Sequence, residues 1–411
     1  MSKKSPQLRF EGFTDDWEQR ELREHAKYRR GSFPQPYGNK EWYDGAGSKP
    51  FVQVVDVGDN LRLVDNTKQK ISLLAQSKSV FVPAGKVVVT LQGSIGRVAI
   101  TQYDSFVDRT LLIFDEYQLQ TNEYFWAYTI QQKFEIEKQK APGGTIKTIT
   151  KEALSDFEVY LPEYEEQKKV GNFFKQLNDT IALHQRKLDL LKEQKKGYLQ
   201  KMFPKNGAKV PELRFKGFTG DWEERKLGEL VEQIIREVPK PNKPYYRMSV
   251  RSHAKGTFKQ FVDNPENVAM DKLFVVKKDD LVVNITFAWE HAIAVVNEEN
   301  DGLLVSHRFP TYRADGKSDI EFLHHVVSKE NFRRKLEFIS PGGAGRNRVL
   351  NKKDFLKLKI FVPKIEEQQK IGSFFKQLDN TIALHQRKLD LLKEQKKGFL
   401  QKNVCLGSII I

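Results

Sequence analysis

Two long stretches of the chain carry apolar residues at alternating spacings of three and four. This spacing is typical of the a and d positions of a coiled coil, sustained here over about four heptads. The positions in the first stretch are Phe174, Leu177, Ile181, His184, Leu188, Leu191, Lys195 and Tyr198, and those in the second are Phe375, Leu378, Ile382, His385, Leu389, Leu392, Lys396 and Phe399. Pro162 and the acidic residues after it favour a helix start, because the first turn tolerates a missing N–H and attracts negative charge. We therefore predict two long helices that share a coiled-coil seam.

The two helical stretches are copies of one another. Residues 165–201 and 366–402 are identical at 31 of 37 positions, and a shorter segment at 8–22 recurs at 213–227. A repeat of about 200 residues is too long for a solenoid and indicates a duplicated half. Two near-identical seams can pair with each other, and a twofold relation between the halves predicts that the helices run antiparallel.

The blocks between the repeats differ in sequence but share a pattern of elements. Val- and Ile-rich runs at 84–100 and 278–296 predict strands, and apolar helical stretches follow at 122–136 and 319–336. We predict the α+β class, with two similar mixed α/β domains separated by an antiparallel two-helix coiled coil, and an internal pseudo-twofold repeat. The expected segments are a repeated N-terminal segment (1–22), domain one (23–161), helix one (162–203), a repeated segment (204–227), domain two (228–362), helix two (363–402) and a divergent tail (403–411).

Two kinds of position depart from a simple two-helix coil. His184 and His385 lie in the seam, where we expect partly buried polar residues that help to fix the register, without a metal. Four leucines fall at c positions, which a two-helix coil leaves in water: Leu183, Leu190, Leu384 and Leu391. They indicate a covering element, which is either helices of a partner protein or the chain's own short repeats, through Leu8, Phe10, Phe13, Trp17, Leu213, Phe215, Phe218 and Trp222.

The net charge of +15, from 69 basic and 54 acidic residues, is spread over both blocks and both helices. Extended positive charge favours a polyanionic partner such as nucleic acid. No run of 18 apolar residues and no apolar signal segment is present, and the single cysteine excludes a disulfide framework. We therefore expect a cytoplasmic protein with no membrane partner.

Loops that combine basic, amide and hydroxyl side chains are candidates for DNA contact, because Arg, Lys, Asn and Gln can read base edges and Ser and Thr can hold phosphates. In the first block they are Arg29, Arg30, Ser32, Tyr37, Lys40, Gln92, Ser94, Arg97, Thr145 and Lys147. In the second block they are Arg247, Arg251, His253, Lys255, Trp289, His291, Arg346, Asn347 and Arg348. For each residue the alternative is an ordinary solvated loop side chain.

Catalytic motifs are missing from the sequence. It contains no G-x-x-x-x-G-K-[ST] phosphate loop, no tetrapeptide of adenine methyltransferases, no nucleophile elbow and no metal-ligand spacing among its eight histidines. We therefore interpret the chain as a binding protein without catalysis of its own.

Several segments resemble the specificity subunit of Type I restriction–modification enzymes, over nearly the whole chain. They are the helical repeat LPEYEEQKKVGNFFKQLNDTIALHQRKLDLLKEQKKGYLQKMF, the opening segment LRFKGFTGDWEERKLGEL, and the elements GSIGRVAI and PGGTIK. One departure is the end of the second helix, which continues as NVCLGSIII and matches nothing in the first half.

The resemblance implies a non-catalytic subunit whose two target-recognition domains each read one half of a bipartite, asymmetric DNA target. It implies double-stranded DNA and two methyltransferase subunits as partners, joined in the full complex by motor–nuclease restriction subunits. S-adenosylmethionine, ATP and Mg would then act in the partners, with no cofactor on this chain. A helix of about 39 residues would span about 58 Å and so set a DNA spacing of at most about 17 base pairs. The alternative function is a coiled-coil adaptor without sequence-specific DNA binding.

Overall fold

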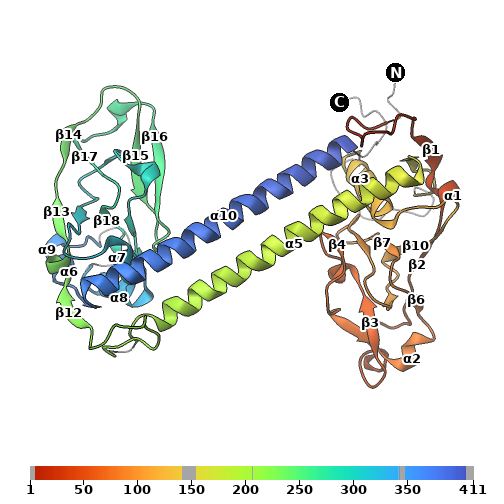
Figure 1. The fold of residues 1–411 in the computed structure, drawn as a ribbon, viewed down its shortest axis with the longest axis horizontal. Coiled ribbons are helices and arrows are strands. Elements are labelled where there is room, and N and C mark those ends of the chain that lie inside the picture. The colour runs from red at the N-terminus through yellow and green to blue at the C-terminus, as the bar shows by residue number, and fades with distance from the viewer. Residues whose placement is uncertain (1–4, 141–153, 206, 341, 343–347, 404–411) are drawn as a thin grey trace. The chain divides into compact units, whose positions relative to one another are not determined.

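In the computed structural model, residues 5–140, 154–205, 207–340, 342 and 348–403 are described. The chain divides into two compact units, one formed by residues 1–186 and 387–411 and the other by residues 187–386. Each unit holds one globular domain, termed domain 1 and domain 2, with the beginning of one long helix and the end of the other (Figure 1).

The two long helices are α5 (Tyr164–Lys201) and α10 (Ile365–Asn403). In each helix the seam side chains are buried or half-buried, and Phe174, Ile181 and Leu188 are at most 3% exposed. The c-position leucines of both helices are between 58% and 66% exposed. The heptad pattern therefore separates the packed edge of each helix from its solvated edge correctly.

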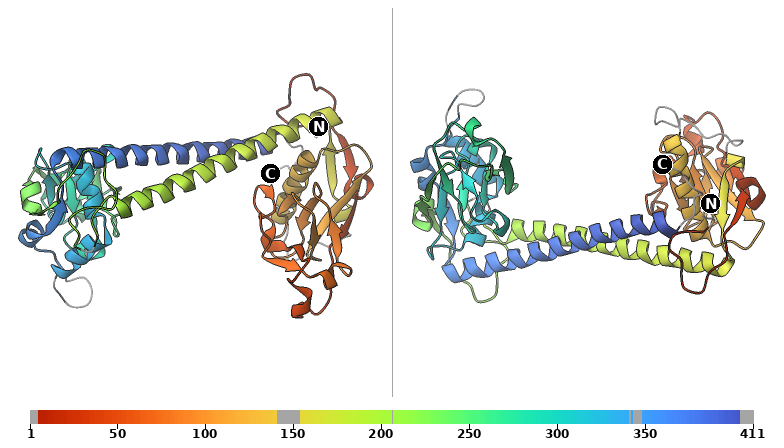
Figure 2. Two further views of the ribbon diagram at one scale, coloured as in Figure 1. Left: turned by 60° about the horizontal axis from the view of Figure 1, so that its bottom comes forward. Right: turned by 90° about the horizontal axis from the view of Figure 1, so that it is seen from above.

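Contacts inside each unit show that the helices run antiparallel. In the first unit Phe173, near the start of α5, packs edge-on against Phe399, near the end of α10, at a ring distance of 5.1 Å. In the second unit Tyr198 and Phe374 make the reciprocal contact at the same distance. Figure 2 gives two further views of these helix ends. The predicted antiparallel pair is confirmed. In these end contacts Phe173 and Phe374 take part, and each lies one residue before a predicted seam phenylalanine.

Domain 1 contains two main sheets and one long helix, α3 (Glu123–Lys140). The five-stranded sheet has the order β2 (Ala26–Arg30), β10 (Leu111–Tyr117), β7 (Val87–Thr90), β8 (Val98–Ile100) and β4 (Leu61–Arg62). The four-stranded sheet has the order β5 (Gln69–Ile71), β3 (Lys49–Val52), β9 (Ser105–Val107) and β6 (Val80–Val82). Short helices α1 (Leu22–His25) and α2 (Leu73–Gln76) complete the domain.

Strand β7 shows why these runs are wholly apolar. Val87 and Val89 point into the core that includes α3, whereas Val88 points into a second core on the other side of the sheet. Both faces of the strand are thus covered, which a continuous Val run predicts and strict alternation would not.

Domain 2 also has two main sheets, but the sheet that packs on its helices has four strands and the other sheet has five. Its four-stranded sheet has the order β13 (Glu232–Ile234), β21 (Thr311–Arg313), β18 (Leu281–Val283) and β19 (Ile293–Val295). Its five-stranded sheet has the order β14 (Glu237–Pro239), β17 (Lys272–Val275), β20 (Leu304–Val305), β15 (Tyr245–Val250) and β16 (Thr257–Val262). The helices are α6 (Leu227–Leu230), α7 (Ile320–Val327), α8 (Glu330–Phe338) and α9 (Lys352–Lys357).

Both domains are closed by the same strand pair. β1 (Glu18–Glu21) pairs antiparallel with β11 (Glu158–Leu161), and β12 (Glu223–Lys226) pairs in the same way with β22 (Lys359–Val362). The repeated segments therefore form a common frame on which the variable blocks are mounted, and the predicted α+β class with an internal repeat is confirmed. None of the described helices is both long enough and apolar enough to cross a membrane.

Candidate nucleic-acid interface

The loop between β7 and β8 presents three of the predicted DNA-binding residues of domain 1. Buried Thr90 organises this loop, since its hydroxyl donates to the Ser94 carbonyl and accepts from the Arg97 amide at 3.0 Å. Gly96 has a positive φ of 78°, and a Cβ there would lie 2.7 Å from Phe134. The close fit leaves Gln92, Ser94 and Arg97 exposed.

Other predicted residues of domain 1 already have partners within the protein. The guanidinium of Arg29 donates to Asp115 at 2.8 Å, and Arg97 lies 3.8 Å from Asp59. Ser32 donates to the Lys78 carbonyl at 3.4 Å. Lys40 and Arg30 are exposed, and Tyr37 is half-buried. Thr145 and Lys147 lie outside the described residues.

In domain 2 the loop after β15 carries Arg251, His253 and Lys255, which are all exposed. The loop is fixed to the segment 288–291, because the amide of His253 donates to the Glu290 carbonyl at 2.8 Å. Arg251 lies over the ring of Phe258 at 5.0 Å. These three residues stay candidates for DNA contact on a positioned loop.

The other predicted residues of domain 2 have different surroundings. Exposed Arg247 donates to Gln260 at 3.0 Å, and Arg348 lies over the half-buried ring of Trp289 at 5.5 Å. Arg346 and Asn347 lie outside the described residues.

The prediction for His291 is wrong. Its side chain is 3% exposed, and its Nε2–H donates to the Val327 carbonyl at 2.6 Å. Burial lowers its pKa, so the ring stays neutral in the core. His291 connects β19 to α7 and is not placed to contact a ligand.

The two domains share one feature that was not identified from the sequence, the carboxyl end of a parallel strand pair, which we term the shared edge. In domain 1, β3 and β9 pair in parallel, and in domain 2, β15 and β20 pair in parallel. The carboxyl ends of these strands bring the following loops together. In domain 1 this edge carries Asp108, Arg109 and Thr110. A strand ending in a run of charged and hydroxyl residues was the available signal.

A buried ion pair anchors each domain to the beginning of its long helix. Arg9 donates to both carboxylate oxygens of Glu166, at 2.9 and 2.7 Å, and Glu166 is 1% exposed. Trp17 adds an indole N–H to the same carboxylate at 3.2 Å. Arg214 and Glu367 repeat the pair in the second unit at 2.7 and 2.6 Å. We term these two pairs the anchors.

Replacing Arg9 with Met should destabilise the first unit by about 3 kcal/mol, because it leaves the buried Glu166 carboxylate without its cation. Urea unfolding of the full chain, followed by tryptophan fluorescence, measures the loss. Arg62→Met is the matched control, since Arg62 is exposed in the same unit and its replacement should cost less than about 0.5 kcal/mol. Equal losses in the two variants would contradict the assignment.

One of the two explanations for the c-position leucines is wrong, because these side chains are exposed in the structure. The short repeats do not cover them, because Trp17 packs on Phe125 at 5.6 Å and Phe10 packs on Phe173 at 6.0 Å. Trp222 packs on Phe322 in the equivalent way at 5.6 Å. The leucines therefore remain candidates for docking a partner protein.

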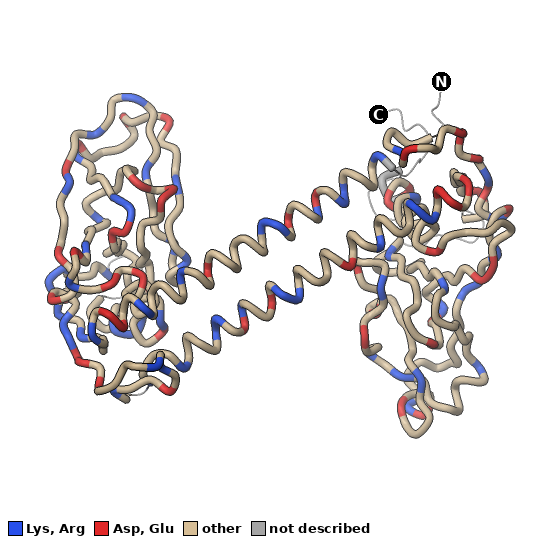
Figure 3. The backbone as a smooth tube through the Cα atoms, in the orientation of Figure 1, with Lys and Arg blue, Asp and Glu red and all other residues tan. Residues whose placement is uncertain are grey.

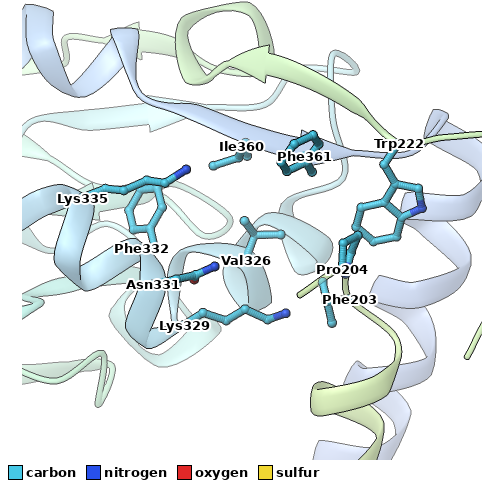
Figure 4. Close-up of a pocket in the computed structure, with 10 residues that line it drawn as sticks. All are labelled: Phe203, Pro204, Trp222, Val326, Lys329, Asn331, Phe332, Lys335, Ile360 and Phe361. Atoms are coloured by element: carbon cyan, nitrogen blue, oxygen red, sulfur yellow. The ribbon is translucent and has the colours of Figure 1, made fainter. Parts of the chain in front are cut away.

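A pocket at the end of α5 contains two lysines in apolar surroundings (Figure 4). The Lys329 amine lies 3.6 Å from the centre of the Phe203 ring, and Trp222 and Phe332 also line the pocket. Burial lowers the pKa of Lys329 to about 7 and also lowers that of Lys335. In the folded protein the Lys329 amine is therefore mainly neutral only above about pH 7.

This lowered pKa predicts a pH dependence of stability. Below pH 7 the folded state must hold a charged, half-buried amine, and that cost falls as the pH rises from about 7 towards the ordinary value of 10.5. Lys329→Met should raise the stability at pH 7 by about 1 kcal/mol and flatten its rise between pH 7 and 10. Denaturant unfolding at several pH values checks this, with exposed Lys353→Met as the control. An unchanged pH profile would refute it.

Basic and acidic residues are interspersed on both domains and along both helices (Figure 3). Within the described residues, no three or more His, Cys, Asp and Glu side chains are grouped so as to hold a metal ion. The seam histidines His184 and His385 are half-buried.

Comparison with known proteins identifies relatives of this chain. The Type I restriction modification DNA specificity domain family matches residues 14–193 and again residues 219–394. The Type I restriction enzyme MjaVIII specificity subunit of Methanocaldococcus jannaschii is 20% identical, over 94% of this chain and 91% of the relative. The putative type I restriction enzyme MjaX specificity subunit of the same organism is 24% identical, over 62% of this chain and 60% of the relative.

A solved structure shares the fold. The Type-I restriction-modification system S subunit from M. genitalium superimposes with a TM-score of 0.61 at 14% identity, covering 97% of this chain and 99% of that one. The two family matches together span most of the sequence and fall once on each half of the repeat. The chain therefore belongs to the Type I restriction–modification DNA specificity family.

Proposed function

We propose that this chain is the DNA specificity subunit of a Type I restriction–modification complex and has no catalysis of its own. Domain 1 reads one half of a bipartite DNA target and domain 2 reads the other half. The two halves of the target differ in sequence, because the two domains carry different loops on the same frame.

The observation that carries this proposal is the double match to a DNA specificity domain on a duplicated frame. The frames agree in detail, as the anchors and the closing strand pairs show. The loops on them do not agree, since Asp108–Thr110 in domain 1 corresponds to Ser306–Arg308 in domain 2. A constant frame with variable loops is what two dissimilar half-sites require.

The partners follow from the same assignment. Other restriction–modification subunits and DNA form the complex, in which two methyltransferase subunits dock on the exposed c-position leucines of α5 and α10. Motor–nuclease subunits join for restriction. S-adenosylmethionine, ATP and Mg act in these partner subunits, and the paired helices set the spacing between the half-sites.

Sequencing of methylated adenines in the source cell, with and without this gene, tests the proposal. We expect one gene-dependent motif with two defined halves around an undefined gap. A methylation pattern that is unchanged by deletion of the gene would refute the proposal.

A coiled-coil adaptor without DNA specificity is the second candidate, which the exposed leucines alone would favour. Duplex binding by the assembled complex separates the two functions. Contacts to several phosphates make affinity fall steeply with salt concentration, whereas an adaptor shows no specific duplex binding at any salt concentration.

A further inference from the structure

The shared edge of domain 1 is a built surface rather than a loose loop. β3 and β9 run parallel, with Phe51 beside Phe106 and Val52 beside Val107. The residues that follow, Gln53–Val55 and Asp108–Thr110, line one hollow together with Tyr37 and Lys68. Two strand ends and one loop therefore converge on the same place.

A glycine brings the loop that carries Tyr37 against β9. A Cβ at Gly31 would lie 2.2 Å from the Val107 carbonyl and 2.3 Å from the Asp108 carbonyl, so no side chain fits there. The next residue, Ser32, donates its amide to the Val107 carbonyl at 3.0 Å. The chain then turns through Phe33 to Tyr37 at the rim of the hollow.

Tyr37 is held by three contacts. Its ring stacks on Phe33 at 5.1 Å with an angle of 18° between the rings. Its hydroxyl donates to Asp108 at 2.5 Å, and its carbonyl accepts from the Tyr43 hydroxyl at 2.8 Å. Asp108 is 2% exposed and also accepts from the Thr110 amide at 2.9 Å. These bonds occupy the buried carboxylate and fix the orientation of the tyrosine ring.

Arg109 and Lys68 are exposed cations that line this hollow, and Arg109 is the one that stacks on Tyr37. Its guanidinium lies over the Tyr37 ring at 5.1 Å. Among the described residues none forms an ion pair with Arg109, whereas Arg29 on β2 is paired with Asp115. A planar guanidinium held on a fixed aromatic ring loses little side-chain entropy on binding.

We propose that Arg109 reads a guanine in the half-site of domain 1, with Tyr37 as its positioning residue. This inference rests on the proposed function of the chain. Arginine donates two parallel hydrogen bonds to O6 and N7 of guanine in the major groove, and this is the commonest base-specific contact. At the equivalent strand end of domain 2 the exposed residues are His307 and Arg308, which differ from Arg109 and Thr110 in domain 1. One topological position thus reads different bases in the two halves.

The test replaces the chromosomal gene in the source cell with variants and sequences the methylated adenines. In Arg109→Ala we expect one G·C position of one half-site to accept other bases, with discrimination there reduced about 10-fold or more and the second half-site unchanged. Arg109→Lys should relax the same position, because it keeps the charge but loses the two-pronged donor geometry. Exposed Arg62→Ala, on β4, is the matched control and should keep the wild-type motif.

Other outcomes overturn the inference. An unchanged motif in Arg109→Ala, whether methylation is normal or evenly weaker, would show that Arg109 contacts a phosphate or nothing. A wild-type motif without a G·C pair in the relaxed half would refute guanine reading. If the Arg109→Ala protein does not accumulate in the cell, the motif of the Arg109→Lys variant provides the test. A wild type with no gene-dependent motif would instead refute the proposed function, and this result is visible before any variant is compared.

Discussion

Exchange of residues 23–157 for the equivalent block of another family member should change one half of the methylated motif and leave the other half as it was. The block can be exchanged because the frame continues on both sides of it. Leu22 donates its amide to the Phe157 carbonyl at 2.8 Å, just inside the β1–β11 pair. The recipient therefore keeps its anchor, its closing strands and both long helices.

The reciprocal exchange, of residues 228–358, is the matched control. Its junction is equivalent, since Leu227 donates to the Leu358 carbonyl at 2.8 Å inside the β12–β22 pair. It should alter the opposite half of the motif. The exchanged block must supply aromatic partners for the helix, as Tyr128 does for Phe174 at 4.8 Å. Sequencing of methylated adenines reads both halves at once, and a change in both halves after one exchange would contradict independent domains.

The helices and their seam could be predicted because their information is local. A period of 3.5 residues and a repeat that is identical at 31 of 37 positions need no knowledge of distant contacts. The anchors could not be predicted in the same way. Glu166 looks like an ordinary acidic residue in the first turn of a helix, and its partner Arg9 lies 157 residues earlier. Only the repetition of both residues in the second half hinted at a pair.

The candidate binding residues also differ in whether local sequence or distant contacts decide their exposure. Gln92, Ser94 and Arg97 are exposed on a loop, as glycine-flanked polar residues between two apolar strands predict. His291 also lies between two apolar strands, but the chain turns there with a φ of +65° and directs the ring towards α7. Arg109 was missed because its partner ring, Tyr37, comes from a loop 72 residues earlier, which the Gly31 and Ser32 amides hold against Leu111 and Val107. Contacts between loops so far apart in the chain leave no short-range signal in a sequence.

Polar substitution of the c-position leucines should separate assembly from folding. In the variant with Leu183, Leu190, Leu384 and Leu391 all changed to Gln, we expect binding of methyltransferase subunits to fall at least 100-fold and DNA methylation to cease. Burial of a leucine is worth about 1.5–3 kcal/mol, so four buried leucines would contribute far more than such a loss requires. The fold itself should be unaffected, since each of these side chains is at least 58% exposed in the free chain.

Pull-down of the methyltransferase subunits by the full chain measures the assembly, and thermal unfolding of the same samples measures the fold. Lys192→Gln with Lys393→Gln is the control, because both lysines are exposed on the same helices but lie outside the row of leucines. The control should assemble normally. Normal assembly in the leucine variant would place the docking surface elsewhere, whereas a lower melting temperature would show that the leucines pack within the chain. Loss of assembly at an unchanged melting temperature is the combination that only a docking role produces.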